Sequence, residues 1–492
     1  GSAFRVILGE PEKVGDLSSV TSKASALQEA QAQVQSVTAY PISAEELILR
    51  GTSAGQGGDW HMINPAESGV NTTYLPADGS TPGRFVAYIT TPLAPNTVQS
   101  ATYAYPRLID FRNQTTKHMG NATANEIYNA SYVDPSSGGA RMVIWPTSLT
   151  DDDWPGQTGH VAFASVWSSN YTDMGGGTVN VLHAFAHVED NDQNDDGIKN
   201  TAGTYEHIGY VRSRTGYEDF GRTFNKTNHS AGNAIIRYVS PEQDITMLAY
   251  PSKLYGCGGA SVFGTTDYYY MIYHARPTVK NVTGEDDTLA AGIAIARATK
   301  TAIDTWTYPY SNNPWTKYRQ IVSATTSHLN WGQPGIGGVE TILWNSLKEN
   351  GLRSPKTDNQ KLWRAFPKIS YNVYLATPYV HQMVMICKGG IDKNESKKTG
   401  IALHTSNNLL EWSEFLIIKA DQIGDGVHDY YTYEYPTLIG WDTNPTPPDF
   451  GGYSGQTGEY NKLYYQRDIR RPGQQGALDM DLYRMTVRFL VQ

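Results

Sequence analysis

The sequence predicts an all-β protein, a five-bladed β-propeller with an N-terminal arm and long loops between its blades. The composition is the first reason: 47 Gly, 33 Tyr and only 18% charged residues are typical of turn-rich β structure. The second is a meander of three apolar, aromatic-rich runs within residues 254–300. The third is that this meander recurs along the chain, as propeller units do. A β-sandwich whose strands resemble one another by chance remains the alternative.

The meander that defines the unit has three predicted strands. They cover residues 256–263, 268–273 and 292–298, and a turn at 264–267 and a polar, acidic insertion join them. Runs rich in aromatic and apolar residues between turn signals are typical of antiparallel strands. A single meander exposes too much apolar surface to be stable alone, so neighbouring units are expected to cover it.

Four further stretches show the same order of runs. They cover residues 101–146, 159–223, 362–406 and 433–489. Three phrases are near copies and predict equivalent inner strands: Tyr105-Pro-Arg-Leu-Ile, Phe366-Pro-Lys-Ile-Ser and Tyr435-Pro-Thr-Leu-Ile. We therefore expect a propeller domain over residues 101–492. Residues 1–100 are expected to form an arm and loop region that packs on the propeller, with a strand near 45–50 that closes the ring.

Charge and hydropathy limit the partners. The net charge is −9 and no basic cluster occurs, so the attraction to phosphate that nucleic-acid binding requires is missing. No apolar run is long enough for a membrane span. Nine Asn-X-Ser/Thr sequons are compatible with a secreted or cell-surface protein. Cys257 and Cys387 lie on adjacent units, and both a disulfide and two buried thiols remain open.

The last unit departs from the repeat at one position. Before the aromatic-Pro pair, two of the near copies have Ala104 and Ala365, whereas the last has Glu434. An acid where the repeat otherwise has a small residue indicates function, because function is where local consistency is broken. Partial burial would raise the pKa of a carboxyl group and suit it to proton donation. Tyr433, directly before it, and Arg364, before Ala365, are expected to contact substrate.

Two loops supply further candidate acids. Asp59 follows two glycines and precedes Trp60 and His61, a composition that suits a site loop because glycines let the backbone approach a ligand. Asp153 ends an acidic run before the inner strand of the second unit. A solvated turn is the alternative interpretation of each.

The second unit combines two histidines and an acid on one strand. The alternation of a strand places His183, His187 and Glu189 on one face, where they are candidates for a metal site or for acid–base chemistry. A hydrogen-bonded strand end explains the same pattern equally well.

A candidate calcium loop follows directly. Alternate oxygen ligands before a glycine match the core of a calcium loop, and we predict a structural Ca²⁺. The expected ligands are Asp192, Asn194, Asp196 and the carbonyl of Ile198. The twelfth position is Gly203 instead of an acid, and Glu206 is the expected substitute. A hydrated acidic loop remains the alternative.

The units resemble the five-bladed β-propeller glycoside hydrolases, a group that includes the family 43 arabinanases and xylosidases, the invertase-like family 32 and the D-arabinanases. The resemblance covers residues 101–490 and rests on the phrases Gly258–Ser261, Tyr268–Tyr273 and Gly292–Arg297. Glu434-Tyr435-Pro436 resembles the Glu-Gly-Pro of that group, with Tyr in place of Gly. The Asp-Pro that the group has at its first inner strand is not intact.

The resemblance implies hydrolysis of a polysaccharide or oligosaccharide, with an arabinan- or fructan-type furanoside as the implied substrate. Glu434 would be the general acid, and a second carboxylate would activate water or attack the anomeric carbon. The candidates for this second acid are Asp59, Asp153, Asp110 and Glu189.

Two other classes of function remain open. One is a carbohydrate-binding or adhesion propeller, such as a phage or cell-surface receptor-binding module. The other is a polysaccharide lyase, for which His187 and Arg364 are suitable residue types. The arrangement around Glu434 discriminates between the three classes, because two facing acids favour a hydrolase.

Overall fold

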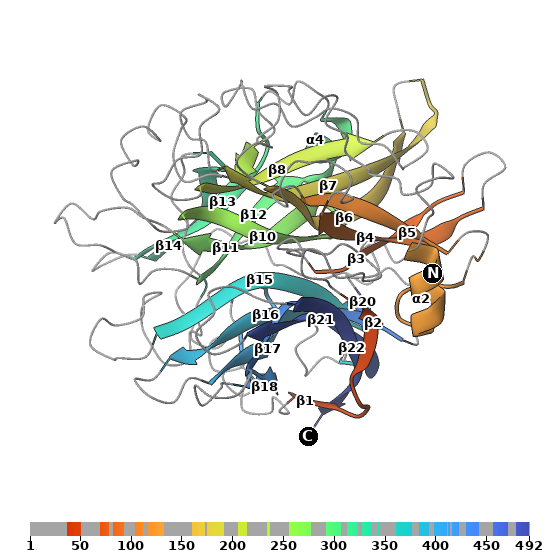
Figure 1. Cartoon of the computed structure of the whole chain (residues 1–492). Coiled ribbons are helices and arrows are strands. Elements are labelled where there is room, and N and C mark those ends of the chain that lie inside the picture. Colours follow the sequence, from red (N-terminus) through yellow and green to blue (C-terminus); the bar gives the residue numbers. More distant parts are fainter. Residues whose placement is uncertain are drawn as a thin grey trace.

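The computed structural model describes a propeller of five blades, each built mainly from antiparallel strands (Figure 1); their strands form four hydrogen-bonded sheets, because two neighbouring blades share one sheet. No helix in the described part of the chain is long and apolar enough to cross a membrane. The described residues are 37–50, 69–77, 82–92, 104–111, 114, 116–131, 160–172, 175–190, 205–213, 234–236, 255–276, 292–306, 312–322, 327–336, 343, 361–375, 383–392, 398–410, 412–413, 416–422, 430–441, 456–470 and 479–491.

Each blade is a meander whose strands follow one another in sequence. Blade 1 contains β3 (Asn71–Leu75), β4 (Arg84–Pro92) and β5 (Ala104–Asp110). Blade 2 contains β6 (His160–Thr172), β7 (Thr178–Asp190), β8 (Tyr205–Ser213) and β9 (Ala234–Ile236). Blade 3 contains β10 (Tyr255–Gly264), β11 (Tyr268–Arg276), β12 (Gly292–Thr299), β13 (Thr316–Val322) and β14 (Ser327–Pro334), with helix α4 (Lys300–Thr305) after β12. A short parallel pairing of β8 with β10 joins blades 2 and 3 into one sheet.

Blades 4 and 5 complete the ring. Blade 4 contains β15 (Lys361–Asn372), β16 (Met383–Asp392), β17 (Lys398–Ser406) and β18 (Leu416–Ala420), with β20 (Gln456–Thr457) parallel to β15. Blade 5 contains β19 (Tyr430–Gly440), β21 (Tyr460–Arg470) and β22 (Asp479–Val491), to which β1 (Val37–Pro41) and β2 (Glu46–Leu49) are added. The sequence prediction of strands is thereby confirmed for the units at 159–223, 254–300, 362–406 and 433–489.

Buried apolar clusters fill the space between neighbouring blades. One cluster joins blades 1 and 2, a large one joins blades 2, 3 and 4, a third joins blades 4 and 5, and a fourth joins blades 5 and 1. Representative members, in that order, are Val86 with Val166, Phe185 with Tyr269 and Ile369, Val384 with Leu463, and Ile439 with Ile89. Because these interfaces run around the whole ring, no blade has to be stable alone. Cys257 and Cys387 are buried and are not joined by a disulfide.

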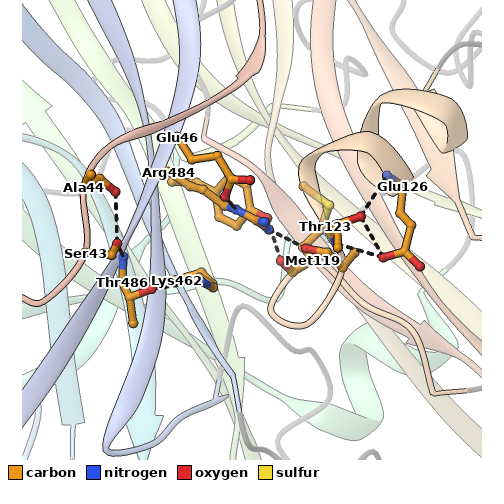
Figure 2. A network of polar contacts seen from close by, with 11 residues as sticks. Ser43, Ala44, Glu46, Met119, Thr123, Glu126, Lys462, Arg484 and Thr486 are labelled. Carbon is orange, nitrogen blue, oxygen red and sulfur yellow. Dashed lines mark hydrogen bonds and ion pairs between the residues drawn. The ribbon is translucent and has the colours of Figure 1, made fainter.

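The N-terminal segment closes the ring, as the sequence predicts for residues 45–50. Strands β1 and β2 both pair with β22, the last strand of the chain. Figure 2 shows how Arg484 of β22 fixes this closure. Its guanidinium donates to Glu46 of β2 at 2.7 Å, to the carbonyl of Ala122 at 2.6 Å and to the hydroxyl of Tyr464 at 3.1 Å. One buried cation therefore ties β2, β21 and the segment before helix α2 together.

Blade 1 differs from the prediction. The phrase that starts at Tyr105 lies in β5, the third strand of the sheet, instead of an inner strand. Residues 124–131 form helix α2 (Ala124–Ser131) and not a second strand. The physical reason is a capping box, in which Glu126 N donates to Thr123 Oγ1 at 3.2 Å and Thr123 N donates to the Glu126 carboxylate at 2.8 Å. The boundary expected at residue 100 falls inside this sheet, because β3 and β4 pair with β5.

A β-bulge interrupts the inner strand in four blades. The register shifts between residues 163 and 165 in β6, 258 and 261 in β10, 365 and 368 in β15, and 434 and 437 in β19. Backbone amides after two of the bulges donate to the serine of the preceding blade: Val262 N to Ser165 Oγ at 3.1 Å, and Ile369 N to Ser261 Oγ at 3.0 Å. The bulges of these blades therefore lie at one level around the axis.

Candidate functional site

Glu434 lies at the bulge of β19, where it faces blade 4. Its carboxylate Oε1 is 3.3 Å from Nζ of Lys388 in β16, and its side chain is 17% exposed. At the equivalent bulge position β10 has Gly258 and β15 has Ala365. Only blade 5 therefore places a carboxylate at this position among these three bulges.

Lys388 connects Glu434 to a second carboxylate. Its ammonium bonds both oxygens of Asp421, each at 2.7 Å. Asp421 also accepts from Thr399 Oγ1 at 2.6 Å and from the backbone amide of Tyr433 at 3.0 Å. These bonds occupy the lone pairs of Asp421, so this carboxylate is a fixed anion that orients Lys388 instead of a group free to react.

The charge on Lys388 changes what is expected of Glu434. Partial burial alone disfavours a carboxylate anion, as the sequence analysis assumed, but a neighbouring ammonium stabilises it. Lys388 shares its charge between Glu434 and Asp421, so it holds the two carboxylates of blades 4 and 5 together. Sequence reasoning missed both Lys388 and Asp421. The signal for Lys388 was a charged residue directly after the apolar run Met383–Cys387.

Tyr433 is placed for packing. Its side chain is 1% exposed, its ring lies edge-on to Tyr465 at 5.5 Å, and Nζ of Lys419 lies 4.7 Å from its ring centroid. Burial raises the pKa of Tyr433 to about 12. Tyr433 contributes to the site through its backbone amide, which donates to Asp421 and helps to position it.

Two aromatic residues beside Glu434 have strained backbones. Phe366 and Tyr435 both have φ of 52°, a left-handed conformation that non-glycine residues rarely adopt. In blade 3 the corresponding position is Gly259, with φ of 56°. Such strain costs about 1–3 kcal/mol per residue and concentrates at functional sites. The rings of Phe366 and Tyr435 lie 4.5 Å apart, so the two strained positions form one aromatic pair that joins the bulges of β15 and β19.

A buried histidine cluster supports Phe366. His274 Nδ1 accepts from the amide of Phe366 at 3.4 Å, and His274 Nε2 therefore carries the proton that it donates to Glu206 at 2.9 Å. His187 Nδ1 accepts from the amide of Gly259 at 3.3 Å. His187, Glu206 and His274 are all at most 1% exposed. Their place is the interface of blades 2 and 3, and no group of three or more His, Cys, Asp or Glu suited to a metal occurs among the described residues.

His183 belongs to a separate buried network. Its Nδ1 bonds the hydroxyl of Tyr210 at 2.7 Å and its Nε2 lies 2.8 Å from Ser169 Oγ. Ser169 and Tyr269 both donate to Asp304 of helix α4, at 2.9 and 2.8 Å. Burial raises the pKa of Asp304, but the bonds from its neighbours outweigh burial and hold the pKa below its ordinary value. This network fixes α4 on blade 2.

The remaining sequence candidates are one acid of blade 1, two residues known by their strand position alone, and eight that lie outside the described residues. Asp110 ends β5 in blade 1, where it pairs with Arg84 at 2.9 Å. For Glu189 and Arg364 the structure gives the strand position, opposite Glu206 and Gly389 respectively. The candidates that lie outside the described residues are Asp59, Trp60, His61, Asp153, Asp192, Asn194, Asp196 and Ile198.

Comparison with solved structures finds glycoside hydrolases. The catalytic domain of a Coprinopsis cinerea GH62 α-L-arabinofuranosidase is 8% identical over 92% of this chain and 98% of that chain, with a TM-score of 0.34. A GH62 hydrolase in complex with xylotriose is 10% identical over 66% of this chain and 92% of that chain, with a TM-score of 0.23. A Listeria innocua β-1,2-mannobiose phosphorylase is 9% identical over 92% and 88%, with a TM-score of 0.26. At these scores the likeness supports no argument about activity or substrate. No protein-family model matches the sequence, and the comparison with curated proteins finds no match.

Proposed function

We propose that this protein is a glycoside hydrolase that cleaves a polysaccharide or oligosaccharide with Glu434 as a reacting carboxylate. One observation carries the proposal: Glu434 is a partly exposed acid at an inner-strand bulge, held by a lysine that a second, fully bonded carboxylate fixes in place. Such second-layer fixation is what a reacting group needs, because catalysis depends on a narrowly defined geometry.

The roles follow from the contacts. Glu434 supplies the carboxylate that exchanges a proton with the glycosidic oxygen or with water, or that attacks the anomeric carbon. Lys388 and Asp421 are positioning residues, because Asp421 has no free lone pair with which to react. Glycoside hydrolysis needs a second reacting carboxylate, and we assign this role to Asp59, Asp153 or Glu189.

The strained aromatic pair supplies the surface for a sugar ring. Sugar rings have apolar C–H faces that stack on aromatic side chains. Phe366 is partly exposed and can offer such a face, and Tyr435, which follows Glu434 in the chain and is 8% exposed, supports it at 4.5 Å. A furanoside of the arabinan type remains the proposed substrate, and secretion the proposed location, because such polymers are extracellular. The calcium loop at 192–198 is proposed to hold a structural ion.

The histidine geometry argues against a lyase that uses His187. A lyase base must reach the proton at C5 of a uronate, whereas His187 is fully buried and its Nδ1 accepts from a backbone amide. A hydrogen-bonded core histidine of this kind supports the packing of blades 2 and 3.

The test is the release of reducing ends from a panel of plant, fungal and bacterial polysaccharides. Glu434→Gln is expected to lower kcat by roughly a thousandfold or more while substrate still binds. Lys388→Met is expected to shift the pH profile of the remaining activity, because it removes the charge beside Glu434. Glu126→Gln, at the exposed N-terminus of α2, is the matched control and should behave as wild type. Full activity in Glu434→Gln would remove this carboxylate from the mechanism, and binding without cleavage by the wild type would favour a binding module.

A further inference from the structure

The large apolar side chains exposed in the described part of the chain gather on blades 4 and 5. They follow the ends of β15 and β19 or belong to the segment that begins with β1: Tyr40, Ile42, Val373, Tyr374 and Trp441, each 38–44% exposed. Trp441 lies seven residues after Glu434 along β19, which corresponds to roughly 20 Å. This surface is therefore distinct from the site around Glu434.

Five side chains form a continuous surface here, which we name the blade-5 strip: Tyr40, Trp441, Tyr460, Lys462 and Arg488. Tyr460, Arg488 and Tyr40 are cross-strand neighbours on β21, β22 and β1. Trp441 N donates to the carbonyl of Tyr460 at 3.1 Å, and the two rings lie edge to face at 6.4 Å. Backbone pairing thus fixes the spacing of the rings, as a prearranged binding surface requires.

Cations alternate with the rings in the blade-5 strip. Nζ of Lys462 lies 4.5 Å from the Trp441 ring centroid, and Cζ of Arg488 lies 5.3 Å from that of Tyr460. Arg488 is neutralised by Glu459 at 2.8 Å. Lys462 donates to Thr486 Oγ1 at 2.9 Å, as Figure 2 shows. Partial burial and the nearby Arg484 lower the pKa of Lys462, and the Glu46 carboxylate opposes them. Among the described residues, the ammonium of Lys462 is therefore the cation of the strip that forms no ion pair like the one between Arg488 and Glu459.

We propose that the blade-5 strip binds a polysaccharide that carries carboxylates, such as uronate units, at a distance from the reacting site. The exposed Trp441 ring offers a stacking surface for the apolar face of a sugar, and the ammonium of Lys462, 4.5 Å from that ring centroid, attracts its carboxylate. Lysine is depleted at the centre of protein–protein interfaces, and Lys462 lies directly beside the exposed Trp441 ring, so a glycan fits this surface better than a protein partner.

This inference shares with the proposed function only the premise that the protein meets polysaccharide. Binding at the strip would hold a polymer near the propeller while Glu434 acts on another part of it. Trp441 and Lys462 would then affect the use of long polymers, whereas short oligosaccharides that cannot reach both surfaces would be cleaved at the same rate without them. The two proposals can therefore fail separately.

The test measures binding of polygalacturonate and of neutral arabinan to the full chain carrying Glu434→Gln, by calorimetry at low and high salt. Trp441→Ala and Lys462→Met are each expected to weaken binding of polygalacturonate by roughly tenfold. Methionine keeps the apolar stem against Trp441 and removes only the charge. The salt dependence seen with Lys462 should largely disappear in Lys462→Met, since an exposed ion pair is screened by salt.

Tyr374→Ala is the matched control, because this tyrosine is equally exposed but belongs to blade 4. Polygalacturonate binding that is absent in the parent, or that is unchanged in both strip variants, would overturn the proposal. Equal affinity for neutral arabinan would overturn the assigned role of Lys462. Sedimentation that shows a dimer abolished by Trp441→Ala would identify the strip as an interface between copies of the chain and overturn glycan binding. A second Trp441→Ala variant that keeps the native Glu434 is assayed for hydrolysis of short oligosaccharides. This activity reports on the reacting site independently of binding at the strip.

Discussion

Lys368 is expected to make the stability of the protein depend on pH, and Lys368→Met should remove this dependence. The lysine lies on β15 directly after the bulge and is 7% exposed. Its Nζ donates to Asn71 Oδ1 of β3 and to the carbonyl of Ala164 in β6. Both acceptors are neutral. Two acceptors match the two N–H groups of a neutral amine, and no anion among the described residues compensates an ammonium.

The sign of the effect follows from the direction of the shift. Burial lowers the pKa of Lys368 from 10.5 to about 7. Below about pH 7 the folded chain carries a buried ammonium, and its full cost is present. Above pH 10.5 the amine is neutral in both states and the cost is absent. Between these values the unfolded chain binds more protons, so the free energy of unfolding rises with pH.

The magnitude follows from the same two values. A shift of one unit corresponds to about 1.4 kcal/mol, so the difference between 10.5 and about 7 corresponds to roughly 5 kcal/mol over the whole range. The slope is at most about 1.4 kcal/mol per pH unit. Lys368→Met also leaves two buried acceptors without a donor, at a cost of roughly 1–3 kcal/mol each. This second cost does not depend on pH, so the slope separates the two effects.

The assay is denaturant unfolding of wild type and Lys368→Met at a series of pH values from 7 to 10. Other groups titrate in both proteins, and the difference between the two curves isolates Lys368. Lys117→Met, which replaces a partly exposed lysine paired with Glu126, should leave the slope unchanged. Parallel curves for wild type and Lys368→Met would refute the reasoning. Direct titration of the labelled Lys368 amine by NMR tests it without any variant.

Three further outcomes are expected. Arg484→Met should lower the free energy of unfolding by about 2 to 3 kcal/mol, because its buried partners lose their donor. Arg488→Met, on the surface of the same strand, should change this free energy little, and calorimetric unfolding measures both. Gly258→Ala should lower the free energy of unfolding by about 2 kcal/mol or more, since its Cβ would lie 2.1 Å from Nδ1 of His187. Gly458→Ala is the control in the same assay and should be neutral, because no atom lies within 4 Å of its Cβ. Ca²⁺ should raise the Tm of the wild type but not of Asp196→Ala, and equal shifts would contradict the calcium loop.

Much of the ring was predictable because its signal is local. Aromatic and apolar runs between turns identify strands, and the recurrence of these runs identifies the blades. Blade 1 was predicted wrongly because the phrase at Tyr105 resembles the phrases of β15 and β19 only in its side chains. Those two strands have a β-bulge at the phrase, whereas β5 pairs with β4 without one. The Thr123-x-x-Glu126 capping box was present in the sequence and indicates a helix start. The prediction instead assigned residues 101–146 to a repeated unit of strands.

The site was less predictable because its contacts are not local. The position of Glu434 followed from its departure from the repeat, but the ion pair with Lys388 depends on how blades 4 and 5 pack. Asp421 follows a strand end in an ordinary-looking segment, and no pattern in the sequence sets it apart. Only the fold shows that it holds Lys388 beside Glu434.

The inner-strand bulges explain why the proposed chemistry belongs to blade 5. At the bulges of blades 2 and 3 the first residues after the shift are serines that accept from the backbone of the next blade, which is a structural use. In blades 4 and 5 the left-handed position is aromatic where blade 3 has a glycine. A chain that only needed a closed ring would gain stability from glycine there, because glycine adopts this conformation without strain. Phe366 also has a structural use, since it packs against the His187 and His274 rings. The strained pair nevertheless follows the one acid among the three compared bulge positions, which supports the proposal that Glu434 is a reacting group, because strain concentrates at functional sites.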